Sequence, residues 1–181
     1  MIGSADIVKA VSDVSFEIHA GETLGLVGET GSGKTTVGRC ILRLIEPTSG
    51  RIVFRGQEVS GISQREFRRL RDRMQMVFQE PYDALNPRMK IGAIVAEPLV
   101  LQGKLNSVQR RQRVLELLRM VLLGEEMLGR YPHQVSAGEA QRVGIARSMA
   151  TNPDLIIFDE PTSGLDISIR ADIMDLSLIH I

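Results

Sequence analysis

The sequence predicts an α/β fold with a mostly parallel core sheet, and three stretches carry this prediction. An apolar run over 23–27 indicates a buried strand, and it leads through a glycine-rich turn into a helical pattern over 36–45. A second run, over 155–158, is continuously apolar, which is typical of a parallel strand buried on both faces. Between the two runs, the pattern over 91–128 is helical. Strands that alternate with helices favour a sheet covered by helices.

The N-terminal part should add antiparallel strands. Residues 7–20 alternate between polar and apolar, which predicts a strand with one buried face. Its apolar side chains are Val11, Val14, Phe16 and Ile18. After the first helix, 51–54 indicates another strand, and 55–57 a hairpin turn. This part of the chain therefore combines antiparallel strands with a strand–loop–helix unit.

The stretch 63–73 should form a short basic helix, with Ser63 as its N-cap and Glu66 completing a capping box. Its five arginines could contact phosphate or nucleic acid, or could simply form a solvated face. The neutral total charge favours the solvated face. A buried strand over 74–78 follows and ends at Gln79, and the two prolines in 80–87 predict a loop.

Helices dominate the next part of the chain. The clearest runs from 107 to 123, with Val114, Leu117, Leu118 and Val121 on one face. Ser136 and Glu139 have the spacing of a capping box, so another helix should begin there and continue to about residue 150. A last helical pattern covers 167–176.

The glycine-rich turn at 28–35 matches the pattern G-x-x-x-x-G-K-[ST], the phosphate-binding P-loop. Its glycines can adopt backbone conformations that direct N–H groups onto phosphate oxygens at the positive end of a helix. Lys34 would reach the β- and γ-phosphates, and the Thr35 hydroxyl would bind Mg²⁺. The predicted ATP-binding residues are Gly28, Glu29, Thr30, Gly31, Ser32, Gly33, Lys34, Thr35 and Thr36.

Two carboxylates, Asp159 and Glu160, follow the apolar strand at 155–158. Functional residues of open α/β sheets gather at the carboxyl ends of strands. Asp159 would hold Mg²⁺, and Glu160 would act as the general base on the attacking water. Two acids can also simply end a strand and begin a turn, but the P-loop upstream favours the catalytic interpretation.

Composition and charge narrow the function classes. The 181 residues suffice for one domain with a core, and 43% hydrophobic with 24% charged residues is typical of globular proteins. Lys+Arg and Asp+Glu both number 22, so there is no electrostatic case for nucleic-acid binding. The single cysteine, Cys40, excludes an internal disulfide and is expected to pack rather than to act in redox chemistry.

Four stretches together resemble the ATP-binding subunit of ABC transporters: 28–35, Gln79 after a strand, 136–139 at a helix start, and 155–166. Their order and separations match, and the resemblance extends to about residue 176. The stretch 77–89 is similar, more narrowly, to the subunits that power bacterial dipeptide and oligopeptide importers, with nickel importers as close relatives.

The resemblance implies a P-loop NTPase fold of the ABC type, with an antiparallel β subdomain and an inserted helical subdomain. It implies one domain over 1–175, incomplete at both ends. The core and β part would cover about 1–88 and 151–175, and the helical subdomain about 89–150. The remaining residues, 176–181, resemble the translated read-through of a sequencing adapter, and we expect this tail not to be native.

The resemblance also implies roles and partners. Two such subunits, identical or different, would pair head to tail, and the signature of each would bind the ATP of the other. Gln79 would contact Mg²⁺ and the attacking water as a second catalytic residue, and the Gln79–Pro87 loop would bind transmembrane permease subunits. Asp166 would lie in a loop that spans the dimer. The signature residues are Ser136, Ala137, Gly138 and Glu139.

The implied function is ATP hydrolysis that powers import of peptides or related solutes, at the cytoplasmic face of a bacterial plasma membrane and without nucleic acid. Departures from the family pattern keep alternatives open. The usual signature is Ser-Gly-Gly-Gln, so Glu139 adds negative charge near the expected γ-phosphate. An aromatic residue ahead of the first strand and a switch histidine after Glu160 are both missing. The alternatives are a nucleotide-binding module without turnover and a non-transport ABC ATPase.

Overall fold

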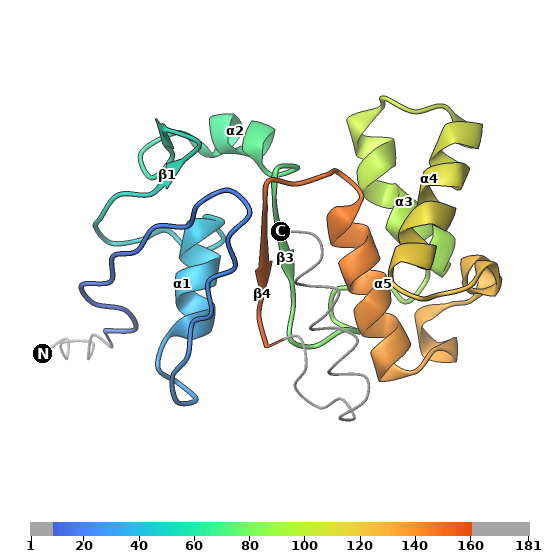
Figure 1. The fold of residues 1–181 in the computed structure, drawn as a ribbon, viewed down its shortest axis with the longest axis horizontal. Helices are drawn as coiled ribbons and strands as arrows, with labels where there is room; N and C mark the ends of the chain where they lie inside the picture. Colours follow the sequence, from blue (N-terminus) through green and yellow to red (C-terminus); the bar gives the residue numbers. More distant parts are fainter. Residues whose placement is uncertain (1–8, 161–181) are drawn as a thin grey trace, which may run out of the picture. The chain divides into compact units, whose positions relative to one another are not determined.

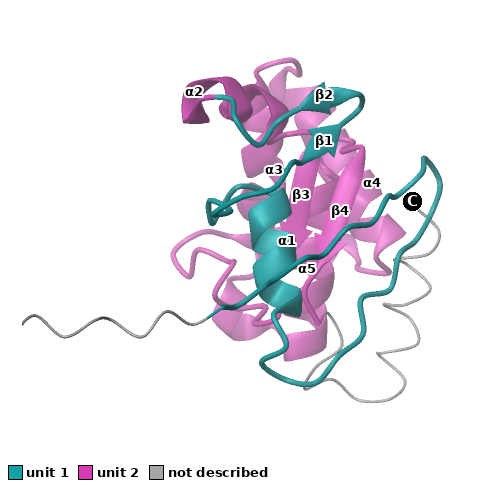
Figure 2. Cartoon of the chain, turned by 90° about the vertical axis from the view of Figure 1, so that its left-hand side faces the viewer, with its two compact units in different colours: residues 1–62 teal, residues 63–181 magenta. Residues whose placement is uncertain are grey.

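The structure, a computed structural model, describes residues 9–160 of the chain. The chain divides into two compact units, residues 1–62 (unit 1) and 63–181 (unit 2), which Figure 2 distinguishes by colour. Asp166 and the helical pattern over 167–176 lie outside the described residues.

Unit 1 contains helix α1 (Lys34–Ile41), which follows the glycine-rich turn as predicted. The helix ends earlier than residue 45, because Arg43 takes a left-handed conformation with φ 47°. The Arg43 side chain is buried, and its guanidinium donates to the carbonyl oxygens of Val59, at 3.2 Å, and Ile62. These hydrogen bonds stabilise the early end of the helix, because they connect it to residues near the end of unit 1.

A short hairpin completes unit 1. Strands β1 (Val53–Phe54) and β2 (Gln57–Glu58) pair in antiparallel fashion, with Val53 opposite Glu58. The two turn residues, Arg55 and Gly56, have φ of 52° and 80°. Two consecutive positive φ angles are what a two-residue type I′ hairpin turn requires. The predicted strand and hairpin turn are confirmed.

Two other strand predictions in unit 1 are wrong. Residues 9–20 and 23–27 belong to no strand of the described structure, and their apolar side chains are largely exposed. Val14 is 50% exposed and Val27 94%. A strand exists only where a neighbour pairs its N–H and C=O groups, and no strand within residues 9–160 pairs with these segments. The polar–apolar alternation of the first segment and the apolar run of the second do not by themselves supply that neighbour.

Unit 2 contains a parallel strand pair. Strand β3 (Met74–Val77) pairs with β4 (Leu155–Phe158), with Met74 opposite Leu155 and Val77 opposite Phe158 (Figure 1). Both strands and the parallel direction were predicted. The expectation that β4 is buried on both faces is wrong: its side chains are half-buried, and β3 is its one strand neighbour among the described residues. Both strands reach their carboxyl ends at the same edge.

The helices of unit 2 begin at well-defined caps. The predicted capping boxes of Ser63 with Glu66 and Ser136 with Glu139 are confirmed, and Asn106 with Gln109 forms another, at the start of α4, that was not predicted. The helical elements are α2 (Gln64–Phe67), the 3₁₀ turn η1 (Arg68–Leu70), α3 (Ile91–Gln102), α4 (Ser107–Met120), the 3₁₀ turns η2 (Glu125–Gly129) and η3 (Pro132–Gln134), and α5 (Ala137–Met149).

The apolar core of unit 2 lies among α3, α4 and α5. Each helix contributes fully buried side chains, and burying one large aliphatic side chain contributes about 1.5–3 kcal/mol. The core therefore fixes the position of α5 and of the Ser136 turn before it. The side chains with no exposed surface include Ile91, Val95, Leu117, Val143 and Ala146.

Candidate functional site

The turn before α1 has the features of an anion site. Gly31 and Gly33 have φ of 84° and 93°, and Gly33 is the N-cap of α1. No side chain caps this helix, and its first turn has no acidic residue. The first N–H groups of a helix have no intrahelical partner, and the helix dipole places partial positive charge there. The turn therefore suits a phosphate group.

Gly33 is required here on two grounds. Its φ lies in the left-handed region that favours glycine. A Cβ at this position would also lie 2.3 Å from the carbonyl oxygen of Ala10. The backbone of the turn thus approaches another segment of unit 1 so closely that any side chain would displace it.

Lys34 is already oriented by the turn. Its Nζ atom donates to the carbonyl oxygens of Gly28, at 2.7 Å, and Glu29, at 2.8 Å. An ammonium group has three N–H donors, so Lys34 can hold the turn and a phosphate oxygen together. Thr35 and Thr36 lie in the first turn of α1 and are partly exposed. These residues fit a triphosphate, with the Thr35 hydroxyl as an oxygen ligand for Mg²⁺.

In unit 2, three predicted site residues lie together where strands β3 and β4 reach their carboxyl ends. Gln79 Nε2 donates to Glu160 Oε2 at 3.2 Å, although the two residues are 81 positions apart. Between them, Asp159 N–H donates to the carbonyl oxygen of Val77 at 2.9 Å and extends the ladder. Asp159 is buried and Glu160 is exposed. The site therefore has one buried carboxylate and one carboxylate open to water, with an amide group oriented onto the second.

Glu160 also has an unusual backbone. Its φ is 46°, a conformation that is uncommon for a residue with a Cβ. Such positions cost about 1–3 kcal/mol and concentrate at functional sites. Arg43 and Arg55 have similar φ angles at a helix end and in a hairpin turn, so the functional role of Glu160 rests on its contact with Gln79 rather than on its backbone conformation.

The turn before α5 carries the predicted signature residues. Glu139 Oε2 accepts hydrogen bonds from Ser136 N at 2.8 Å and Ser136 Oγ at 2.9 Å, and Arg130 lies 4.0 Å from its other oxygen. The bond from the Ser136 backbone, above all, lowers the pKa of Glu139 from its ordinary value of 4.5. Ser136 and Ala137 are exposed, and Gly138 is buried. A full negative charge thus lies beside an exposed helix N-terminus.

The lowered pKa of Glu139 predicts a pH-dependent contribution to stability. Because the folded pKa lies below the unfolded one, ionised Glu139 stabilises the fold above about pH 4.5, and this contribution is lost as the pH falls through the folded value. At neutral pH, Glu139→Gln should lower the free energy of unfolding by about 0.5 kcal/mol, since glutamine keeps the capping box but removes the charge. Denaturant unfolding of both proteins at neutral pH and at about pH 3 measures this.

Glu116→Gln is the matched control, because Glu116 is an exposed glutamate in the C-terminal half of α4, far from the N-terminus of that helix. A difference between wild type and Glu139→Gln that is the same at both pH values would contradict the assignment.

Further contacts near these residues were not predicted. Tyr82 Oη donates to the carbonyl oxygen of Val135 at 2.9 Å, Gln141 Nε2 to that of Phe78 at 3.4 Å, and Arg147 to that of Ala84 at 2.8 Å. The partners are 53 to 63 positions apart, so no local pattern in the sequence could indicate them.

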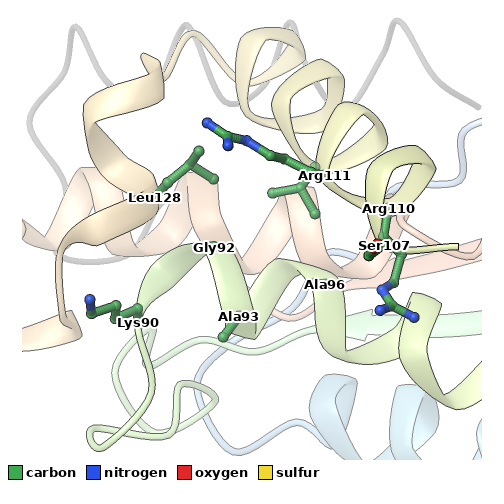
Figure 3. Close-up of a pocket in the computed structure, with 9 residues that line it drawn as sticks. Lys90, Gly92, Ala93, Ala96, Ser107, Arg110, Arg111 and Leu128 are labelled. Carbon is green, nitrogen blue, oxygen red and sulfur yellow. The ribbon is translucent and has the colours of Figure 1, made fainter.

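A pocket of about 310 Å³ lies elsewhere in unit 2, between α3 and α4 (Figure 3). None of the predicted site residues lines it. Its cationic side chains already have partners: Arg111 pairs with Glu125 at 2.9 Å, and Arg110 donates to the carbonyl oxygen of Leu105. Lys90 lies 6.0 Å from the centre of the Tyr131 ring.

Residues 9–160 contain neither a membrane-spanning helix nor a self-sufficient metal site. No helix there has the length and apolar character needed to cross a membrane. No group of three or more His, Cys, Asp or Glu residues in that range could hold a metal ion by itself.

Comparison with known proteins identifies the family. The family described as "ABC transporter" matches residues 11–163. A putative peptide import ATP-binding protein of Brucella ovis is 50% identical over 169 residues, which cover 93% of this chain and 53% of the relative. The oligopeptide transport ATP-binding protein OppF of Bacillus subtilis is 51% identical over 174 residues, 93% of this chain and 56% of its own length. The chain spans about half the length of the curated relatives it matches.

Solved structures agree with these matches. The ATP-binding cassette MJ0796, in a dimeric post-hydrolysis state bound to ADP and Pi, superposes with a TM-score of 0.85 at 34% identity, over 93% of this chain and 73% of that one. The protein cbiO1 of Clostridium perfringens, described as part of the ABC transporter complex cbiONQ, gives a TM-score of 0.82 at 29% identity, over 94% of this chain and 66% of that one. The predicted fold class, a P-loop NTPase of the ABC type, is confirmed, and the chain belongs to the ABC transporter family.

Proposed function

We propose that this chain is part of an ATP-binding and ATP-hydrolysing subunit that powers import of peptides or related small solutes. The contact of 3.2 Å between Gln79 Nε2 and Glu160 Oε2 carries the proposal for hydrolysis. It places a solvent-accessible carboxylate and an orienting amide at the carboxyl ends of neighbouring parallel strands. Relatives named for peptide and oligopeptide transport support the class of solute.

Each unit supplies part of the chemistry. In unit 1, the first N–H groups of α1 and the Lys34 ammonium bind the β- and γ-phosphates of ATP. In unit 2, Glu160 accepts the proton of the attacking water, and Gln79 orients that water. Thr35, Gln79 and Asp159 would hold Mg²⁺, which would neutralise charge on the phosphate oxygens.

The proposed partners follow from the family. This chain would pair with a second ABC subunit, identical or different. The ATP bound by that subunit would contact the signature residues of this chain, which are Ser136, Ala137, Gly138 and Glu139. Asp166 would lie in the loop that spans the dimer. The Gln79–Pro87 loop would bind transmembrane permease subunits at the cytoplasmic face of the membrane. The dimeric state of MJ0796 supports such pairing. The zero net charge gives no electrostatic case for nucleic acid as a partner.

We also propose that residues 1–175 form one domain with two parts. The core and β part would cover about 1–88 and 151–175, the helical subdomain about 89–150, and 176–181 would lie outside it. The location of the α3–α4–α5 core within 89–150 supports the helical subdomain.

The experiment that tests the function is phosphate release from ATP by this chain, with Mg²⁺ present and with Mg²⁺ chelated, alongside a measurement of ATP binding. Turnover that depends on Mg²⁺ and on Glu160 supports the proposal. ATP binding without turnover, even at protein concentrations that give dimers, would favour the second candidate, a nucleotide-binding module. The charge of Glu139 beside the signature turn is the observation that favours this second candidate.

Glu139 gives a further prediction. Its charge should oppose the approach of an ATP γ-phosphate to the α5 N-terminus, and Arg130 at 4.0 Å offsets it only in part. We expect Glu139→Gln to raise the association constant for ATP-driven dimerisation about two- to fivefold. Sedimentation with ATP and without Mg²⁺ measures it, with Glu116→Gln as control. Equal or weaker dimerisation of Glu139→Gln would contradict the prediction.

A further inference from the structure

The loop between β3 and α3 is anchored at several points along its length. It leaves β3 beside Gln79, passes the N-terminal end of α5 and enters α3 (Figure 1). Leu85 in this loop is 2% exposed and belongs to the core of unit 2. A surface loop of this kind is usually mobile. Here both side chains and backbone are held by the rest of the unit.

Two contacts connect the start of this loop with α5 and the turn before it: Gln141 Nε2 donates to the carbonyl oxygen of Phe78 at 3.4 Å, and Tyr82 makes the shorter contact, directly to that turn. Its hydroxyl donates to the carbonyl oxygen of Val135 at 2.9 Å. Val135 is buried and immediately precedes Ser136, the N-cap of α5. Tyr82 follows Gln79 by three residues. One hydrogen bond thus connects the neighbourhood of the Gln79–Glu160 pair with the signature turn.

Arg147 holds the next part of the loop. Its guanidinium donates to the carbonyl oxygen of Ala84 and to Glu97 Oε2, both at 2.8 Å. The Arg147 side chain is 33% exposed and that of Glu97 is 41% exposed, so water weakens the ion pair. The planar guanidinium nevertheless bonds the two acceptors from two separate nitrogens in a fixed plane, a geometry that the single ammonium nitrogen of a lysine does not reproduce. Arg147 of α5 therefore holds the loop at Ala84 and is itself held by Glu97 of α3.

We infer that Tyr82 is a positioning residue that couples the Gln79–Glu160 pair to the signature turn. Arg147 holds the same loop at Ala84, two residues after Tyr82. This inference rests on the proposed function of both ends. When nucleotide binds or is hydrolysed, a change in the position of Gln79 displaces the loop. The hydrogen bond of the Tyr82 hydroxyl transmits this displacement to Val135 and Ser136. The site on one subunit and the surface offered to the partner's nucleotide then respond together.

The test is Tyr82→Phe, which removes one oxygen atom and keeps the ring. Losing a single hydrogen bond corresponds to about a two- to tenfold effect. We expect kcat for ATP hydrolysis to fall by about fivefold while KM for ATP is unchanged. Amide hydrogen exchange, read with and without ATP, should show that residues 80–89 still respond to ATP but that residues 135–140 respond less than in wild type.

Tyr131→Phe is the matched control, because it is the same chemical change at the other tyrosine, whose ring stacks on His133. Arg147→Lys is the second variant and should also reduce the ATP response of residues 135–140. Unchanged exchange responses in both Tyr82→Phe and Arg147→Lys would overturn the coupling, even in a chain without turnover. Absence of wild-type turnover would instead count against the proposed function, so the two failures are distinguishable.

Discussion

Replacing Glu160 by glutamine should lower ATP turnover by about a hundredfold or more and leave ATP binding nearly unchanged. Glutamine keeps an oxygen that can accept the hydrogen bond from Gln79 Nε2, now 3.2 Å from Glu160 Oε2, so the local geometry should persist. It cannot accept the proton of the attacking water. The experiment therefore separates general-base catalysis from positioning.

Phosphate release at saturating ATP measures the rate, and fluorescence titration with a labelled ATP analogue measures binding. Glu116→Gln is the control for loss of one negative charge, since Glu116 is half-exposed and pairs only weakly, at 3.4 Å, with Arg113. Turnover within threefold of wild type in Glu160→Gln would remove Glu160 from the mechanism. A parallel loss of binding would show that its role is structural.

Replacing Gly33 by alanine should weaken ATP binding by about thirtyfold or more. A residue with a Cβ pays about 1–2 kcal/mol in the left-handed region, and Gly33 has φ 93°. The new Cβ would also meet the Ala10 carbonyl oxygen at 2.3 Å, so the turn must move. A total of about 2 kcal/mol corresponds to a thirtyfold loss.

Two other glycines in the same unit provide matched controls. Gly31 has φ 84° but open space around it, so Gly31→Ala should lose only the free energy that a Cβ costs in the left-handed region. Gly25 has open space and no positive φ, and Gly25→Ala should bind ATP like wild type. Thermal unfolding of each variant separates lost binding from lost folding. If Gly33→Ala binds ATP as well as Gly25→Ala, the steric account of the turn is wrong.

The sequence predicted best those features that a few neighbouring residues determine. The capping boxes at Ser63 and Ser136 depend on residues three positions apart, and the Arg55–Gly56 turn on two adjacent residues. The strands predicted over 7–20 and 23–27 are not found in the described residues for the opposite reason, because a strand depends on a partner that its own sequence does not specify.

The candidate site shows the same division. The end of an apolar strand downstream of a P-loop named Glu160, and the resemblance to ABC transporter subunits named Gln79. Their roles stay predictions. The contacts of Tyr82 and Arg147 could not be predicted, since each depends on how a loop and a distant helix pack in three dimensions. Nor does the motif reveal the positive φ of Glu160.

The capping boxes at the starts of α2, α4 and α5 have a consequence for the order of folding. Each box closes a ring of only a few residues, so the ends of α2, α4 and α5 can form at low entropic cost before the rest of the unit collapses. The pairing of β3 with β4 must instead bring together residues 74 and 155 across most of the unit, which favours late formation. Gln79 and Glu160 follow these two strands, so the catalytic pair would be among the last features to assemble.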